Sequence, residues 1–264
     1  MRDRYAVVGN PVSHSSSPWI HAEFARATGQ DMDYGRIEAP LGGFERTIGD
    51  FRASGGKGLN VTLPFKEAAF RCCTSVSERA AAAQAVNTLA FGDGVYGDNT
   101  DGVGLVTDLQ QNLAFALKGK AVLLMGAGGA AQGVVRPLLD AGVSRLLIAN
   151  RTLARAQALA ARFAVSASPY GELGGQEFEL IINATSAGLA NQAPLLPPGV
   201  LRRGALAYDM VYGRDTAFLA QAREAGARAC DGLGMLVEQA AASFLLWRGV
   251  RPDTKGVLER LRAA

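Results

Sequence analysis

Short apolar runs alternate with longer amphipathic segments along most of this chain. Runs of about five apolar residues without polar alternation are typical of strands buried on both faces of a parallel sheet. From these runs and their flanking turn signals, strands are predicted at Tyr5–Val8, Asp33–Ala39, Gly58–Thr62, Ala121–Met125, Arg145–Ala149, Leu180–Ile182 and Leu206–Val211. Segments of helical length separate most of them, which is the rhythm of a parallel α/β fold.

Helices are predicted where apolar or small residues recur at helical spacing, or where a good cap stands before them. They are Pro18–Thr28, Gly43–Ala53, Ser77–Ala85, Val103–Leu113, Gln132–Ala141, Leu153–Phe163, Asp231–Trp247 and Asp253–Arg262. Ser17 is expected to be the N-cap of the first helix, with Pro18 as its first residue. Asn87–Phe91 and Val95–Asp98 are expected to pair as a hairpin around a Gly-Asp-Gly turn.

One stretch, Ala121–Arg155, combines these elements into a recognisable unit. A buried strand leads into Gly126-Ala127-Gly128-Gly129-Ala130, then a helix, then a second buried strand. Glycines at such a joint let the backbone approach a pyrophosphate, which binds the free amides of the helix N-terminus. Because strand, turn, helix and strand occur in the required order and lengths, the sequence predicts a dinucleotide site here.

The end of the second strand indicates which dinucleotide is bound. NAD-binding units usually carry an acid about 20 residues past the glycines, to hold the ribose hydroxyls. This chain has Asn150-Arg151-Thr152 there, with Arg155 one helical turn later. Arginines at a helix N-terminus oppose the helix dipole unless an anion is present, and two guanidinium groups can clamp a 2′-phosphate. The sequence therefore predicts NADP rather than NAD.

Composition narrows the class of protein further. The chain has 264 residues, 48% apolar and 19% charged, which suits one large or two modest globular domains. It has 32 glycines in 264 residues, about 12% against an average of about 7%, which fits many tight strand–helix joints. The net charge of +3 comes without a basic run, so nucleic acid is not expected as a partner.

Cysteine, histidine and hydropathy patterns limit the compartment and the metal chemistry. Cys72, Cys73 and Cys230 are an odd set without a CxxC pair, so reduced thiols in a cytoplasmic protein are expected. No apolar run approaches the roughly 18 residues of a membrane span, and the N-terminus leads directly into a strand rather than a signal sequence. With His14 and His21 as the only histidines, no metal site is expected.

The first hundred residues hold several polar groups whose role the pattern leaves open. Serines before the helix at Pro18 can hold a carboxylate or can merely cap and turn, and spacing alone favours the second. Asn60, Thr62 and Lys66 lie at or just past the end of the third strand, where ligand crevices form in parallel sheets. For Lys66, spacing alone favours an exposed lysine at a helix edge. The Gly97–Gly102 segment, dense in short polar groups, joins two α/β units, where substrate sites tend to lie.

Eight segments then carry a family resemblance. They are GNPVSHSSSP (Gly9–Pro18), GLNVTLPFK (Gly58–Lys66), AVNTL (Ala85–Leu89), GDNTDGVG (Gly97–Gly104), GAGGAA (Gly126–Ala131), NRTLAR (Asn150–Arg155), INATSAG (Ile182–Gly188) and DGLGMLVEQA (Asp231–Ala240). In order and spacing they resemble the shikimate dehydrogenase family over nearly the full length of the chain. The resemblance implies a substrate domain at 1–101, with 236–264 packing back on it, and a Rossmann-type NADP domain at 102–235. It also implies NADPH-dependent reduction of 3-dehydroshikimate to shikimate, on the route to chorismate and aromatic amino acids.

The same resemblance assigns roles by position. It implies that Lys66 is catalytic with Asp101 as its partner. The implied substrate-binding positions are Ser15, Ser17, Asn60, Thr62, Lys66, Asn87, Asp101, Tyr212 and Gln239. The implied cofactor positions are Gly126, Ala127, Gly128, Gly129, Ala130, Asn150, Arg151, Thr152, Arg155, Met210 and Gly232. Two departures from the family pattern, Leu189 and Arg214, touch no catalytic role.

The implied chemistry is physically consistent. Reducing a ring ketone needs a hydride on carbon and a proton on the developing alkoxide, and a lysine ammonium can stabilise that charge and donate the proton. A neighbouring aspartate would keep the lysine charged and oriented. Two rivals remain: an NAD-dependent quinate/shikimate dehydrogenase, which normally carries an acid after the second strand, and an NADP sensor without turnover, which would be expected to lose Lys66 or Asp101. The oligomeric state stays open, with a homodimer as one option.

Overall fold

The chain folds into two units, each with its own sheet. The computed structural model describes residues 2–185 and 196–263. One unit comprises residues 1–104 and 236–264, and the other comprises residues 105–235. The chain passes between them within two helices, α5 (Asp101–Thr107) and α9 (Leu233–Arg248).

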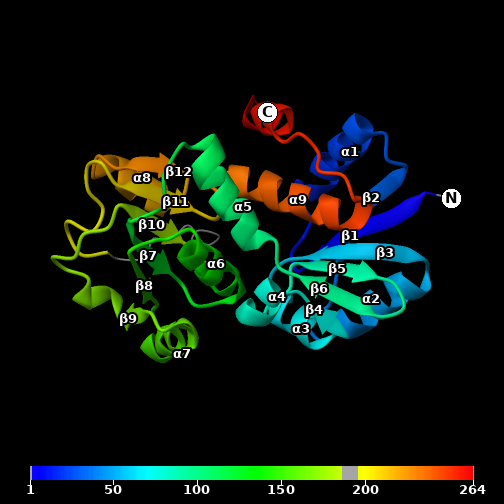
Figure 1. Cartoon of the computed structure of the whole chain (residues 1–264), viewed down its shortest axis with the longest axis horizontal. Coiled ribbons are helices and arrows are strands. Elements are labelled where there is room, and N and C mark those ends of the chain that lie inside the picture. Colours follow the sequence, from blue (N-terminus) through cyan, green and yellow to red (C-terminus); the bar gives the residue numbers. More distant parts are fainter. Residues whose placement is uncertain (1, 186–195, 264) are drawn as a thin grey trace. The chain divides into compact units, whose positions relative to one another are not determined.

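The first unit is built on a mixed six-stranded sheet in the order β2-β1-β3-β5-β6-β4 (Figure 1). Its strands are β1 (Asp3–Gly9), β2 (Met32–Glu38), β3 (Gly56–Val61), β4 (Ser75–Val76), β5 (Thr88–Phe91) and β6 (Val95–Asp98). β1 runs parallel to both β2 and β3, whereas β5 is antiparallel to β3 and β6. The predicted hairpin around Gly92-Asp93-Gly94 is confirmed.

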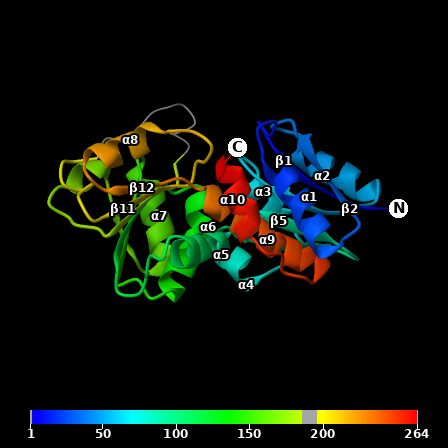
Figure 2. The same cartoon turned by 90° about the horizontal axis from the view of Figure 1, so that it is seen from above.

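Helices cover both faces of this sheet. They are α1 (Ser17–Thr28), α2 (Phe44–Ala53), α3 (Lys66–Arg71), α4 (Glu78–Ala83), α10 (Lys255–Ala263) and the main part of α9. One apolar cluster joins Val8 and Leu59 of the sheet to Phe44 and Ile48 of α2. α10 lies beside α1, where the guanidinium of Arg260 donates to Glu23 at 2.6 Å (Figure 2).

The start of α1 differs from the prediction. Ser17 is already helical, and the N-cap is Ser16, whose side chain makes no capping bond. The Ser15 hydroxyl oxygen instead accepts the Ser17 amide, at 3.2 Å. The hydrogen bond at the helix start is therefore made by the Ser15 hydroxyl and not by the predicted cap, Ser17. Pro18 still occupies the first turn.

The second unit is an all-parallel sheet in the order β12-β11-β10-β7-β8-β9. Its strands are β7 (Ala121–Met125), β8 (Arg145–Ala149), β9 (Ser166–Ser168), β10 (Leu180–Asn183), β11 (Leu206–Asp209) and β12 (Arg228–Cys230). The order reverses between β7 and β10, so the carboxyl ends of these two strands mark the topological switch point of a doubly wound sheet. This is the Rossmann-type arrangement that the sequence predicted.

Both faces of this second sheet are buried, which explains the lack of polar alternation in its strands. Val122 and Leu124 point into one apolar cluster, and Leu123 and Met125 point into another. The covering helices are α6 (Gly129–Asp140), α7 (Leu153–Phe163) and α8 (Ala217–Glu224), with a short 3₁₀ turn, η2 (Tyr170–Glu172). Of the helices in residues 2–185 and 196–263, none combines the length and apolar character that a bilayer crossing requires.

The helix predicted at Val103–Leu113 is wrong in its second half. After α5 the chain forms a π-helical turn, η1 (Asp108–Asn112). The fully buried Asp108 accepts hydrogen bonds from Tyr208 at 2.6 Å and from Asn112 at 2.9 Å. The bond from Tyr208 joins residues 100 positions apart, so the periodicity of the local sequence does not predict it. The predicted ends of β11 and α9 also differ, since β11 stops at Asp209 and α9 begins at Leu233.

Candidate active site

Lys66 and Asp101 form a close, largely buried ion pair in the first unit. Lys66 is the first residue of α3, just after β3 and the turn at Pro64, and Asp101 is the first residue of α5, just after β6. The Lys66 Nζ lies 2.5 Å from Asp101 Oδ2, and the two side chains are only 14% and 7% exposed. The expectation from spacing alone, an exposed lysine at a helix edge, is therefore wrong. A lysine held this way against a carboxylate is oriented rather than freely solvated.

Asn87 fixes the other oxygen of that carboxylate. The backbone amide of Thr100 donates to Asn87 Oδ1 at 2.8 Å, and because an amide N–H can only donate, this contact sets the orientation of the carboxamide. The Asn87 Nδ2 then faces Asp101 Oδ1 at 2.9 Å and Gln239 Oε1 at 3.2 Å. Lys66, Asn87, Asp101 and Gln239 are thus brought together, although they come from four different elements or joints.

The Asn60 carboxamide is also buried in the first unit, but its hydrogen bonds are to other protein groups than Lys66 and Asp101. Its Nδ2 donates to the carbonyl of Asn87 at 3.2 Å and to Ser243 Oγ at 2.9 Å, while its Oδ1 accepts the Tyr34 hydroxyl at 2.7 Å. His21 stacks on Tyr34 with ring centroids 4.1 Å apart, and burial lowers the pKa of His21 to about 3, so this imidazole is neutral. The histidine therefore supports the site by packing.

The serine loop before α1 and Thr62 after β3 supply further polar positions in the same unit. The carbonyl of Ser15 accepts the Arg36 guanidinium at 2.6 Å, and Ser17 is buried at the start of α1. Thr62 follows β3, where its amide donates to the carbonyl of Val8 at 2.9 Å. The last of the predicted substrate positions, Tyr212, belongs to the second unit, just after β11.

The glycine turn of the second unit fits a diphosphate. Gly126 has φ +110°, and a Cβ there would lie 3.0 Å from the carbonyl oxygen of Ala184, so only glycine suits this position. Gly128 is the N-cap of α6 and provides no side-chain cap, and a Cβ on it would meet no atom within 4 Å. Ala127, Gly129 and Ala130 complete the turn and the first residues of α6. The helix therefore begins with uncapped amides beside open space, which is what a bound phosphate requires.

The start of α7 fits a further phosphate. Its N-cap is Thr152, whose side chain makes no capping bond, and its first turn holds no acid. Asn150 Nδ2 donates to the Thr152 carbonyl at 2.9 Å, closing the turn after β8. Arg151 and Arg155 are both exposed at this helix start. Two unburied cations at the positive end of a helix are unfavourable unless an anion is bound, so this helix start suits a phosphate.

Met210 and Gly232 approach each other closely at the end of β11. A Cβ on Gly232 would come within 2.5 Å of the Met210 carbonyl oxygen, so the contact depends on glycine. Asp209, fully buried beside them, accepts the Thr216 hydroxyl at 2.6 Å and the Val211 amide at 3.0 Å. Burial raises the pKa of Asp209 above its usual value. Sequence reasoning missed this carboxyl, which shapes the turn that carries Met210.

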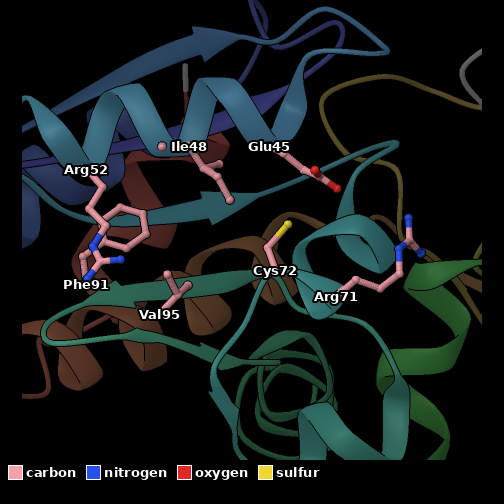
Figure 3. A pocket seen from close by; sticks show the side chains of 8 residues that line it. Glu45, Ile48, Arg52, Arg71, Cys72, Phe91 and Val95 are labelled. Carbon is pink, nitrogen blue, oxygen red and sulfur yellow. The ribbon is translucent and has the colours of Figure 1, made fainter.

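A surface depression of about 340 Å³ lies elsewhere on the first unit, between α2, α3 and the β5–β6 hairpin (Figure 3). Ile48, Phe91 and Val95 supply apolar walls, and Cys72 points into it. Burial raises the pKa of this thiol, which disfavours the reactive thiolate. The depression meets the end of α3 opposite Lys66, and it contains no residue predicted to act in the site.

Three further residues that sequence reasoning missed are buried hydroxyl residues beside Asn60 and Asn87. Thr88, Thr100 and Ser243 are fully buried and surround Asn87 and Asn60. One signal was available: Ser243 stands four residues after Gln239 on the same helix, so both lie on one face. Ser186–Gly188 and Leu189 lie outside the described residues.

Models of known protein families match three successive segments of the chain. Family models match residues 7–89 (shikimate dehydrogenase substrate binding domain), 108–193 (shikimate / quinate 5-dehydrogenase) and 232–262 (shikimate 5′-dehydrogenase C-terminal domain). The shikimate dehydrogenase (NADP(+)) of Aromatoleum aromaticum is 58% identical over 98% of this chain and 97% of its own. The chain belongs to the shikimate dehydrogenase family.

Solved structures of similar proteins share the fold of this family member. An Ael1 enzyme from Pseudomonas putida is 49% identical, with a TM-score of 0.92 over 98% of both chains. The shikimate 5-dehydrogenase of Thermus thermophilus, solved in complex with NADP(H) and shikimate, is 36% identical, with a TM-score of 0.89 over 99% of both chains. Among the described residues of this shikimate dehydrogenase family member, no group of three His, Cys, Asp or Glu side chains is arranged to hold a metal ion.

Proposed function

We propose that this chain catalyses the reversible, NADPH-dependent reduction of 3-dehydroshikimate to shikimate, a step toward chorismate and the aromatic amino acids. The observation that carries the proposal is the buried Lys66–Asp101 pair held by Asn87, in a chain whose full-length relatives are shikimate dehydrogenases. A binding protein without turnover has no need of such a pair.

Lys66 is proposed as the proton donor to the carbonyl oxygen. As the ketone is reduced, negative charge develops on that oxygen, and an ammonium within reach stabilises it and supplies the proton. Asp101, 2.5 Å from the ammonium, keeps it oriented and can accept a hydrogen bond from a substrate hydroxyl. In the oxidation of shikimate the same lysine takes the proton back.

The remaining proposed substrate contacts are short polar side chains. They are Ser15, Ser17, Asn60, Thr62, Asn87, Tyr212 and Gln239. Hydroxyls and carboxamides suit a polyhydroxylated ring because each orients one group without adding net charge. Serine hydroxyls and free amides at the start of α1 suit its carboxylate.

NADPH supplies the hydride. The residues proposed to hold it are Gly126–Ala130 for the diphosphate, Asn150–Thr152 and Arg155 for the 2′-phosphate, and Met210 with Gly232 for the nicotinamide end. The uncapped starts of α6 and α7 support the first two assignments. Met210 and Gly232 are assigned from the family resemblance. The close approach of their backbones supports a role for both residues at the same end of the cofactor.

The proposal divides the work between the units. Residues 1–101 with 236–264 bind substrate and move the proton, and residues 102–235 bind NADP(H). The first division between the observed units falls after residue 104, three residues beyond the expected 101. We further propose the cytoplasm as compartment, since all three cysteines are free thiols, and a homodimer as an assembly state, since β2 lies at the edge of its sheet.

Absorbance at 340 nm tests the function. Purified protein with shikimate and NADP⁺ should form NADPH, and omission of either compound should abolish the rise. Replacing NADP⁺ by NAD⁺, or shikimate by quinate, separates this function from an NAD-dependent quinate/shikimate dehydrogenase. Protein that binds NADPH but produces no absorbance change would instead support a sensor.

A further inference from the structure

A buried cluster of three hydroxyls lies beneath the proposed substrate-binding amides of the first unit. Thr88, Thr100 and Ser243 each have no exposed surface. The Ser243 Oγ lies 2.8 Å from Thr88 Oγ1 and 3.2 Å from Thr100 Oγ1. It also donates to the carbonyl of Gln239 at 3.0 Å and accepts from Asn60 Nδ2 at 2.9 Å. We call this group the hydroxyl cluster.

We propose that Ser243 is a positioning residue that holds the buried Asn60 carboxamide in place and, through the hydroxyl cluster, orients Asn87 toward the substrate; the proposal rests on the proposed function. A hydroxyl has one donor and two acceptor positions. With its proton on the carbonyl of Gln239, Ser243 can accept from Asn60 and from Thr88. Thr100 can then donate to Asn87 Oδ1, which lies 3.2 Å away. Every proton of the hydroxyl cluster finds an acceptor in this arrangement.

Asn60 depends directly on this serine. Its Oδ1 accepts the Tyr34 hydroxyl, so the carboxamide is held from both ends, by Tyr34 on one side and Ser243 on the other. Without the serine oxygen, the remaining acceptors of its Nδ2 are the Asn87 carbonyl and Thr88 Oγ1, both at 3.2 Å. Two long bonds restrain a buried amide less well than a 2.9 Å bond does.

The position of Ser243 in α9 supports a specific role. Around it the helix reads Ala240-Ala241-Ala242-Ser243-Phe244-Leu245-Leu246, so this is the one polar side chain between Gln239 and Trp247. It lies one turn after Gln239, whose Oε1 accepts from Asn87. The same face of α9 therefore contacts Asn87 twice, once through the glutamine and once through the hydroxyl cluster.

Steady-state kinetics of Ser243→Ala test the proposal. The KM for shikimate should rise about tenfold, with kcat within about threefold of wild type and the KM for NADP⁺ unchanged, because the loss concerns orientation of ground-state contacts. Ser243→Thr, which keeps the hydroxyl, should recover most of the affinity. Thr47→Ala is the matched control: it also removes a hydroxyl bond to the carbonyl four residues earlier, 2.9 Å to Gly43, outside the hydroxyl cluster. It should change neither KM.

A double-mutant cycle separates positioning from a purely structural role. In an Asn60→Ala background, Ser243→Ala should raise the KM for shikimate by less than it does in the wild type, because only the path through Thr88 and Thr100 to Asn87 remains. Full additivity, or a Ser243→Ala protein with reduced Tm and wild-type KM, would overturn the proposal. Absence of shikimate turnover in the wild type would instead overturn the proposed function, so the two failures are distinguishable.

Discussion

Asp101 is the residue on which the geometry of the site converges. One carboxylate oxygen lies against the Lys66 ammonium and the other accepts the Asn87 amide. Its position at the start of α5 adds the favourable interaction of an acid with a helix N-terminus. A carboxylate committed to both neighbours fixes the lysine and the carboxamide relative to each other, which is the condition for directed proton transfer.

Asp101→Asn should lower kcat/KM for shikimate by about 100-fold. The substituted amide is nearly isosteric but carries no charge to orient the ammonium. Asp50→Asn, an exposed aspartate on α2, is the control and should leave kcat/KM unchanged. Near-wild-type turnover by Asp101→Asn would remove the carboxylate from the proposed chemistry.

The sequence alone predicts some of the candidate site residues and misses others. Asn60, Thr62 and Lys66 were placed by the rule that ligands lie at the carboxyl ends of parallel strands. Spacing alone favoured an exposed lysine, because the burial of Lys66 depends on Asp101, 35 residues later. The hydroxyl cluster was missed for the same reason. Its members come from β5, the β6–α5 joint and α9, and no local pattern links Ser243 to residues more than 140 positions away.

Among the elements, β6 and α4 are joined by a buried carboxylate. Asp98 accepts the Ser77 hydroxyl at 2.5 Å and the Arg79 guanidinium through both of its oxygens. Burial by itself raises the pKa of Asp98, but hydrogen bonds from Arg79 and Ser77 outweigh it and leave the pKa below its usual value. Asp98 is therefore structural, and it fixes the strand that leads to Asp101.

Asp98→Asn should reduce the free energy of unfolding by about 2 kcal/mol at pH 7. A carboxyl whose folded pKa is lowered stabilises the protein above its unfolded pKa, and this contribution is lost as pH falls through the folded pKa. The difference from wild type should therefore shrink below about pH 4. Urea unfolding across pH measures it, with Asp93→Asn in the exposed hairpin turn as control. A difference that does not change with pH would contradict this account.

The start of α7 yields a prediction on cofactor choice. Replacing Arg151 and Arg155 together by alanine should weaken NADPH binding about 100-fold, because two charge-assisted contacts to the 2′-phosphate are lost. NADH, which lacks that phosphate, should bind as before. Arg162→Ala at the other end of α7 is the control. Equal weakening of both cofactors in a fluorescence titration would show that the arginines do not read the phosphate.

The sequence predicts the strands whose burial makes them apolar, and it misses the short strands that form through pairing with a neighbouring strand. The central strands β7, β8 and β10 are apolar except for Arg145 at the start of β8 and Asn183 at the end of β10, because both sheet faces are covered. The edge strands β9 and β12 have only three residues each and form through pairing with β8 and β11, which a short run such as Ser166–Ser168 does not announce. The π-helical turn η1 likewise depends on Tyr208, 100 residues after Asp108.

For the whole molecule, we assign proton transfer to the first unit and cofactor binding to the second. Lys66 and Arg151 belong to different folded units, so a change in one should leave the function of the other intact. Lys66→Ala protein should accordingly bind NADPH with wild-type affinity. Loss of NADPH binding in this variant would mean that the two functions are not divided in this way.

The most direct test of the central claim is the kcat of Lys66→Ala for shikimate oxidation at saturating shikimate and NADP⁺. We expect a fall of about 1,000-fold, with a much smaller rise in the KM for shikimate, because the lysine acts on the charge that develops at the reacting oxygen. Lys57→Ala, an exposed lysine on β3, should retain wild-type kcat. A Lys66→Ala enzyme with unchanged kcat, and a loss confined to KM, would contradict the account and leave Lys66 as a binding residue.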